Sequence, residues 1–214
     1  MQPDITLWHC KDARSFRVLW ALEELGLPYR LHTLPFPPRW REPAYLETNP
    51  LGTIPFLTDG ATRMTESAAI THYLASRYGR HSDSGSGLNV EPHEPDYGAF
   101  LNFLHQGEAT LTFPQTLVFR YQFLEKPENR QPKVAEDYKR WFLARTTWAE
   151  HTLADGRDWL CANRFTAADI SVAYALLFAE TLGHLPEVSP HLRTFWTRCQ
   201  TRPAFHRAKA AQST

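Results

Sequence analysis

The sequence has few cysteines and no surplus of charge of either sign. Cysteine occurs three times in 214 residues, at Cys10, Cys161 and Cys199. So small and odd a number argues against a disulfide framework and favours a reducing compartment. Lys and Arg together number 23, as do Asp and Glu, so the formal net charge is zero. We therefore expect no overall attraction to nucleic acid or to an anionic membrane.

Long hydrophobic runs are missing as well. No apolar stretch approaches the roughly 18 residues that a membrane span needs. The opening stretch, MQPDITLWHCKD, lacks the apolar segment of a signal peptide. The histidines show no metal-binding spacing such as H-E-x-x-H. The sequence thus predicts a cytoplasmic protein with no membrane segment and no metal.

Short strands and helices alternate in the first part of the chain. The run DITLW predicts a buried strand, and apolar residues at helical spacing predict a helix that Gly26 and Pro28 terminate. A second strand then completes a β-α-β unit, for which parallel strands are expected. The proline-rich loop PFPPRWREP is expected to hold no regular element. The expected elements are strands over 4–8, 29–34, 54–57 and 62–64 and helices over 16–25 and 66–78.

The rest of the chain shows helical patterns only. Residues 81–96 are polar and rich in Gly, Ser and Pro, which indicates a linker between domains. We therefore expect an α/β domain over 1–80, a linker over 81–96 and an all-helical domain over 97–214. Within the helical part, Thr166 and Asp169 have the spacing of a capping box, which predicts a helix start there. Helices are expected over 98–113, 114–123, 135–153, 166–182 and 190–201.

Four stretches, in this order, resemble the cytosolic glutathione transferase family and look like a bacterial-type member. They are FRVLWALEELGLPY, TNPLGTIPFL, TESAAITHYL and NRFTAADISVAYAL. The resemblance covers nearly the whole chain. It implies a thioredoxin-like N-terminal domain joined to an all-helical bundle, a cytosolic homodimer, and glutathione as cosubstrate in a detoxifying transferase.

The resemblance also implies a glutathione-binding set. Pro55 is expected to follow a cis peptide bond, which turns the backbone of Ile54 toward the cysteinyl group of the ligand. Ser67 is expected to hold the α-carboxylate of the γ-glutamyl unit, and Glu66 its ammonium group. A helix N-terminus suits a carboxylate, although capping alone also explains a serine at this position.

The glycine carboxylate of glutathione needs a cation. Arg39 and Arg41 lie in the loop where the family places such a residue, and a guanidinium binds a carboxylate in bidentate fashion. The sequence does not choose between the two arginines. An entirely solvated loop is the alternative for either one.

The thiol-activating position departs from the family pattern. Many bacterial relatives read S-R-S-F-R where this chain has Ala13 in place of the first serine. A glutathione thiol needs a donor or positive potential to ionise near neutral pH. Three candidates remain: the hydroxyl of Ser15, the thiol of Cys10, and backbone N–H groups at the helix N-terminus. A catalytic Cys10 would imply a mixed disulfide with glutathione and thiol transfer.

Three functions follow from these features. The first is conjugation of glutathione to a small apolar electrophile, whose pocket Phe113, Phe119 and Tyr121 are candidates to line. The second is a glutathione-dependent thiol transferase, or oxidoreductase, that uses Cys10. The third is a non-catalytic glutathione-binding protein on the same fold. Cys161 and Cys199 are expected to be buried packing residues.

Overall fold

The computed structural model describes residues 3–79 and 87–213. The chain divides into two compact units, Met1–Asn89 with Gln200–Thr214, and Val90–Cys199. These units differ from the expected domains, because the C-terminal segment belongs to the first unit rather than to the helical one. Of the expected linker, residues 81–86 lie outside the described residues. Residues 87–96 hold no helix or strand.

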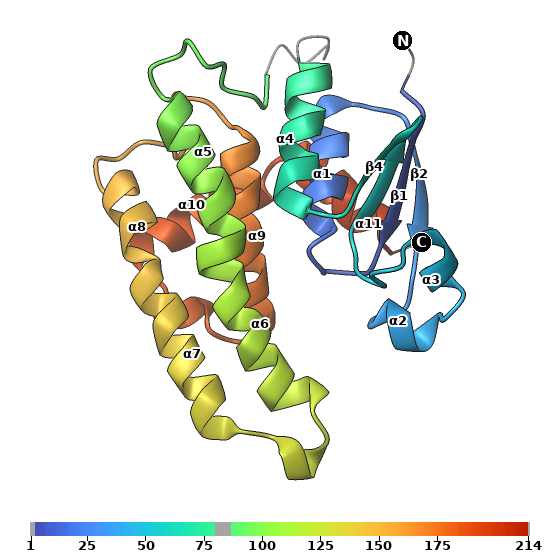
Figure 1. The fold of residues 1–214 in the computed structure, drawn as a ribbon. Coiled ribbons are helices and arrows are strands. Elements are labelled where there is room, and N and C mark those ends of the chain that lie inside the picture. Colours follow the sequence, from blue (N-terminus) through green and yellow to red (C-terminus); the bar gives the residue numbers. More distant parts are fainter. Residues whose placement is uncertain (1–2, 80–86, 214) are drawn as a thin grey trace. The chain divides into compact units, whose positions relative to one another are not determined.

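The first unit is built on a four-stranded sheet with the order β2-β1-β3-β4. β1 pairs in parallel with β2 and antiparallel with β3, and β3 pairs antiparallel with β4. The expected parallel β-α-β unit and the hairpin are therefore confirmed. α1 and α4 pack against each other on one side of the sheet (Figure 1). The elements are β1 (Ile5–His9), α1 (Phe16–Leu25), β2 (Tyr29–Thr33), α2 (Pro38–Arg41), α3 (Tyr45–Thr48), β3 (Phe56–Asp59), β4 (Thr62–Met64) and α4 (Ser67–Tyr78).

The expectation that the proline-rich loop holds no regular element is wrong. The short helix α2 begins at Pro38 within that loop. Proline is tolerated in the first turn of a helix, where its missing N–H would have no intrahelical acceptor in any case. The number of prolines alone does not exclude a helix, because a proline disrupts a helix only beyond its first turn.

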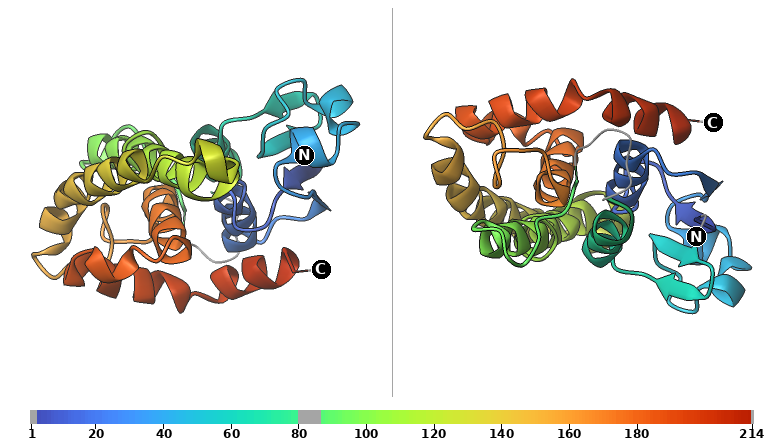
Figure 2. Two further views of the ribbon diagram at one scale, coloured as in Figure 1. Left: turned by 90° about the horizontal axis from the view of Figure 1, so that it is seen from below. Right: turned by 90° about the horizontal axis from the view of Figure 1, so that it is seen from above.

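A helix that the sequence patterns did not predict, α11 (Pro203–Ala211), completes the first unit. It packs along α1 (Figure 2). Phe205 of α11 makes edge-to-face contacts with Phe16 and Trp20, at ring-centroid distances of 5.6 and 5.1 Å. Arg202 adds a bidentate ion pair to Glu24, at 2.6 and 2.7 Å. Buried aromatic contacts of this kind explain why the C-terminal segment folds with the first unit.

The second unit is a helical bundle around α9 (Ala167–Thr181), whose residues are almost all buried. The segment expected as one helix over 135–153 is two helices, α7 and α8, with Thr146 between them. Among the described residues, no helix combines the length and the apolar character needed to span a bilayer. The remaining helices are α5 (Tyr97–Gln106), α6 (Phe113–Phe119), α7 (Pro132–Arg145), α8 (Thr147–Leu153) and α10 (Pro190–Gln200).

The capping box at the start of α9 is confirmed. The Thr166 hydroxyl accepts a hydrogen bond from the Ala168 N–H, and Asp169 Oδ2 accepts one from the Thr166 N–H at 2.8 Å. The Asp169 carboxylate also reaches the N–H of Leu160, nine residues earlier, at 2.9 Å. This side chain therefore fixes both the helix start and the loop before it.

Candidate functional site

The segment before β3 carries a cis peptide bond between Ile54 and Pro55, as the sequence predicts. The side chain of Asn49 organises the turn that leads to it. Asn49 Nδ2 donates to the Thr53 carbonyl at 2.9 Å, and Asn49 Oδ1 accepts from the Leu51 N–H at 3.1 Å. The bonds explain why asparagine suits this position, since its short amide serves as donor and acceptor at once. Pro55 is buried and Ile54 is partly exposed.

The N-terminus of α4 presents hydrogen-bond donors. Glu66 is the residue before the first turn, in an extended conformation and without a side-chain cap. Ser67 follows and is only 3% exposed, whereas Glu66 is exposed. The first N–H groups of a helix have no intrahelical acceptors and carry partial positive charge. The arrangement suits a carboxylate at Ser67 with an ammonium group near Glu66.

Arg17 of α1, which the sequence patterns did not single out, contacts the N-terminus of α4. Its side chain is wholly buried, and its Nη1 donates to Ser67 Oγ at 3.2 Å. Arginine is almost never fully buried without a partner. One sequence signal could have predicted this burial. Arg17 lies within the apolar run FRVLW, at a position that helical spacing places beside buried residues.

The two loop arginines differ in their contacts. Arg39 Nη2 donates to the Leu51 carbonyl at 2.5 Å, which ties α2 to the turn before the cis bond. Arg41 is exposed, and its side chain has no hydrogen bond or ion pair to any described residue, although its backbone N–H donates to the Pro37 carbonyl at 3.1 Å. Trp40 between them is 70% exposed. Arg41 is therefore the loop arginine whose guanidinium is available to a ligand.

The side chain of Ser15 forms two hydrogen bonds with the backbone of Cys10, the other candidate catalytic residue. The Cys10 N–H donates to Ser15 Oγ at 3.2 Å, and Ser15 Oγ donates to the Cys10 carbonyl at 3.3 Å. Both residues are wholly buried in the chain. Burial raises the pKa of the Cys10 thiol to about 12. The hydroxyl thus stabilises the turn before α1, and the thiol stays protonated.

We predict that Cys10 is unreactive in the folded protein. Iodoacetamide at pH 8 is expected to leave Cys10 unmodified, because only a thiolate reacts and a pKa near 12 leaves almost none. Mass spectrometry of the native and the urea-unfolded protein measures this. Rapid alkylation of native Cys10 would contradict the prediction.

Lys209 and Gln212, near the end of the chain, also stabilise the turn before α1. Gln212 Oε1 lies 3.1 Å from the Asp12 N–H and 3.1 Å from His9 Nε2, and Gln212 Nε2 donates to Asp12 Oδ1 at 2.7 Å. Lys209 pairs with Asp12 at 2.5 Å. Burial lowers the pKa of His9 to about 4, so the ring is neutral near pH 7. Contacts between residues 200 positions apart leave no local sequence signal.

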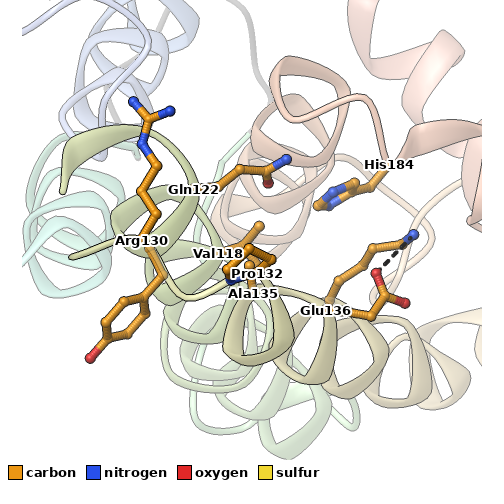
Figure 3. Close-up of a pocket in the computed structure, with 9 residues that line it drawn as sticks. Val118, Gln122, Arg130, Pro132, Ala135, Glu136 and His184 are labelled. Atoms are coloured by element: carbon orange, nitrogen blue, oxygen red, sulfur yellow. Dashed lines mark ion pairs between the residues drawn. The ribbon is translucent and has the colours of Figure 1, made fainter. Parts of the chain in front are cut away.

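A cavity of about 480 Å³ lies within the second unit. Figure 3 shows the amide of Gln122 and the ring of His184 close to the apolar group of Val118, Pro132 and Ala135. The Nδ1 atom of His184 is buried and has no hydrogen-bond partner among the described residues. Burial also lowers the pKa of this histidine. The volume is in the range of a small-molecule site. The lining is mixed, because it also includes three charged side chains, those of Arg130, Glu136 and Lys139.

Of the three aromatic candidates for a cosubstrate pocket, one lines this cavity and two do not. Tyr121 lines the cavity, whereas Phe113 does not and is 52% exposed. Phe119 packs edge-to-face on Phe178, which makes it a bundle contact. Cys161 and Cys199 are free and buried, as the sequence predicts. Within the described part of the chain, no cluster of three His, Cys, Asp or Glu side chains is arranged to hold a metal.

Two models of known protein families match this chain. The model of the glutathione S-transferase N-terminal domain matches residues 13–77, and that of the C-terminal domain matches residues 108–203. The chain belongs to the glutathione transferase family. The thioredoxin-like and all-helical architecture expected from the sequence is therefore confirmed.

Named relatives of this glutathione transferase family member are distant in sequence. Glutathione S-transferase 3 of Schizosaccharomyces pombe is 26% identical over 191 residues, which cover 82% of this chain and 74% of the relative. Glutathione S-transferase 3 of Zea mays is 28% identical over 204 residues, which cover 91% of this chain and 88% of the relative. Both similarities span the two family domains.

Solved structures share the fold. A glutathione transferase from Methylococcus capsulatus has a TM-score of 0.81 at 22% identity and covers 98% of both chains. Ure2p in complex with glutathione has a TM-score of 0.83 at 20% identity, over 99% of this chain and 95% of the other. Another solved chain of this fold is the nitrogen regulation fragment of the yeast prion protein Ure2p. The fold is therefore shared by a glutathione transferase and by a protein fragment named for nitrogen regulation.

Proposed function

We propose that this protein binds glutathione through its first unit and conjugates the thiolate of glutathione to a small, largely apolar electrophile. The observation that carries the proposal is the donor cluster at Ser67, where the N-terminus of α4 and the buried Arg17 converge. This cluster fits the α-carboxylate of the γ-glutamyl unit, with Glu66 near its ammonium group. The cis bond before Pro55 leaves the Ile54 backbone to pair with the cysteinyl group.

The chemistry needs a glutathione thiolate. Its sulfur attacks the electrophilic carbon, a C–S bond forms, and the leaving group departs with its electron pair. Ser15 and Cys10 are buried, and the N–H groups of Phe16 and Arg17 already donate to carbonyls of the turn before α1. We therefore assign the stabilisation of the thiolate to the partial positive charge at the N-terminus of α1. Binding the two reactants together then supplies much of the rate.

The electrophile is expected to be largely apolar. In the cavity of the second unit, Lys139 is held by Glu187 at 2.9 Å and the lowered pKa of His184 keeps that ring neutral. Val118, Pro132 and Ala135 supply an apolar wall. Arg130 and Glu136 line the cavity as well. The apolar wall supports a substrate with a large hydrocarbon part, and the charged side chains leave room for polar groups on it.

The thiol transferase alternative has less support, because Cys10 is buried with a raised pKa. A non-catalytic glutathione-binding role has one feature in its favour, the Ala13 that stands where many relatives have a serine. An assay with glutathione and chlorodinitrobenzene separates the two roles, since only a protein that turns over raises the absorbance faster than the uncatalysed reaction does. The homodimer, the cytoplasmic location and a detoxifying role are further expectations from the family.

Ser67→Ala tests the proposed binding site. We expect this change to weaken glutathione binding about tenfold or more, because a hydrogen bond to a charged group contributes roughly 1.5–3 kcal/mol. Calorimetric titration with reduced glutathione measures the effect. Ser76→Ala is the matched control, since Ser76 is an exposed serine on the same helix. Equal affinity in both variants would refute the assigned role of Ser67.

A further inference from the structure

The turn between β1 and α1 contains a residue in an uncommon backbone conformation. Asp12 has a positive φ of 52°, a value that few residues other than glycine adopt. The side-chain amide of Gln212 holds it there. Gln212 Oε1 accepts from the Asp12 N–H at 3.1 Å, and Gln212 Nε2 donates to Asp12 Oδ1 at 2.7 Å. One buried amide therefore fixes both the backbone and the carboxylate of Asp12.

Lys209 of α11 contacts both the turn and the start of α1. Its Nζ donates to Asp12 Oδ1 at 2.5 Å and lies 5.1 Å from the ring centroid of Phe16, the first residue of α1. The aromatic contacts of Phe205 with Phe16 hold α11 on α1. The ammonium group is therefore kept at the N-terminus of α1, although Lys209 lies 197 positions along the chain from Asp12.

Asp12 is the anion of this turn. Burial opposes its ionisation, but hydrogen bonds from Lys209 and Gln212 outweigh that effect and hold the pKa of Asp12 below its ordinary value. The ring of His9 is neutral near pH 7, and the first turn of α1 contains no acidic residue. The charged and titratable groups around Asp12 come from the turn, from β1 and from α11: Lys11, Arg14, His9 and Lys209.

An uncompensated carboxylate here would oppose the chemistry. The N-terminus of α1 carries partial positive charge, and a negative charge in the adjoining turn cancels part of it. A nearby like charge also disfavours an anion, so it raises the pKa of a thiol bound at this helix end. Lys209 removes both effects, because its ammonium group neutralises Asp12 within hydrogen-bond distance.

We infer that Lys209 is a positioning residue for the glutathione thiolate, which neutralises and holds Asp12 so that the positive end of α1 acts on the sulfur unopposed. This inference rests on the proposed function, since it assumes that the sulfur of glutathione faces the N-terminus of α1. Lys209 acts through Asp12 and does not touch the ligand.

The test measures where the bound glutathione thiol ionises. Ultraviolet absorbance of the thiolate against pH gives one midpoint, and kcat against pH with chlorodinitrobenzene gives a second. Lys209→Met is expected to raise both midpoints by about half a pH unit or more, because Asp12 then keeps its charge without a partner. Arg207→Met is the matched control. It removes a cation from the same helix, but that cation pairs with Glu23 near the other end of α1, so both midpoints are expected to stay unchanged.

A second variant separates the charge from the packing. Asp12→Asn/Lys209→Met removes both charges, and asparagine tolerates the positive φ at this position. This double variant is expected to return the midpoints to within about 0.2 units of the wild type. A merely structural role for Lys209 predicts instead a lower kcat at every pH with no shift of the midpoint, and that result would overturn the inference. A double variant as shifted as Lys209→Met would also overturn it.

The remaining outcomes are distinguishable. Lys209→Gln, which also lacks the charge, replaces Lys209→Met if circular dichroism shows that the methionine variant does not fold. Wild-type protein that binds glutathione without turnover would refute the proposed conjugation, and the absorbance titration would still decide the role of Lys209. Wild-type protein that does not bind glutathione would refute the proposed function and this inference with it. An active wild type whose midpoints Lys209→Met leaves unchanged would refute only the role of Lys209.

Discussion

Asp169→Ala is expected to lower the free energy of unfolding by about 3–5 kcal/mol. The carboxylate accepts hydrogen bonds from the N–H and the hydroxyl of Thr166 and from the N–H of Leu160, at 2.8, 2.9 and 2.9 Å. All three donors lose a partner in the alanine variant, and the residues are buried. Urea unfolding at pH 7, followed by circular dichroism, measures the change.

The size of this effect depends on two opposing contributions. Burial raises the pKa of Asp169 to about 6, so the ionised carboxylate bears a desolvation cost that alanine removes. The buried donors left without acceptors outweigh it, because each costs about 1–3 kcal/mol. Asp137→Ala is the control, since Asp137 forms only an exposed pair with Arg140 one turn along its helix. Similar small losses in both variants would show that the capping box does not stabilise the bundle.

Gly107→Ala is the second change with a large expected effect. A Cβ atom at this position would lie 2.3 Å from Ser171 Oγ and 2.5 Å from the Ser171 carbonyl carbon. Gly107 begins the π-helical segment Gly107–Thr112 where the chain crosses α9, and Ser171 Oγ donates to the Leu104 carbonyl at 2.6 Å. Backbone atoms cannot move aside as a side chain does. We expect a loss of about 3 kcal/mol or more in unfolding free energy.

Gly98→Ala provides the matched control for Gly107→Ala. Gly98 lies in α5, and a Cβ atom there would meet nothing within 4 Å. Alanine favours a helix over glycine by up to about 1 kcal/mol, so this variant is expected to be as stable as the wild type or slightly more so. Equal melting temperatures for the two variants would contradict the close approach of Gly107 to α9.

Local sequence patterns predicted the local structure. The capping box at Thr166 and the helix end at Gly26 were readable because each depends on a few neighbouring residues. Gly26 adopts a positive φ of 61°, the conformation that favours glycine. The parallel β-α-β unit followed from the order of the elements. The family resemblance added the cis bond before Pro55, which no periodicity reveals.

The features that remained hidden depend on contacts between distant segments. The burial of Arg17 depends on the packing of α1 against α4, and its partner Ser67 lies 50 positions along the chain. The placement of α11 on α1 depends on aromatic contacts of Phe205. The sequence left Cys10 as one of three candidates for activating the glutathione thiol. The structure buries it, and desolvation raises its pKa.

A crystal structure with reduced glutathione tests the central claim most directly. We predict that the α-carboxylate of the γ-glutamyl unit accepts hydrogen bonds from the Ser67 hydroxyl and from the first-turn N–H groups of α4. The cysteinyl backbone is expected to pair with Ile54, and the sulfur to face the N-terminus of α1 without a bond to Cys10. A carboxylate bound away from Ser67, or a disulfide between glutathione and Cys10, would contradict the account.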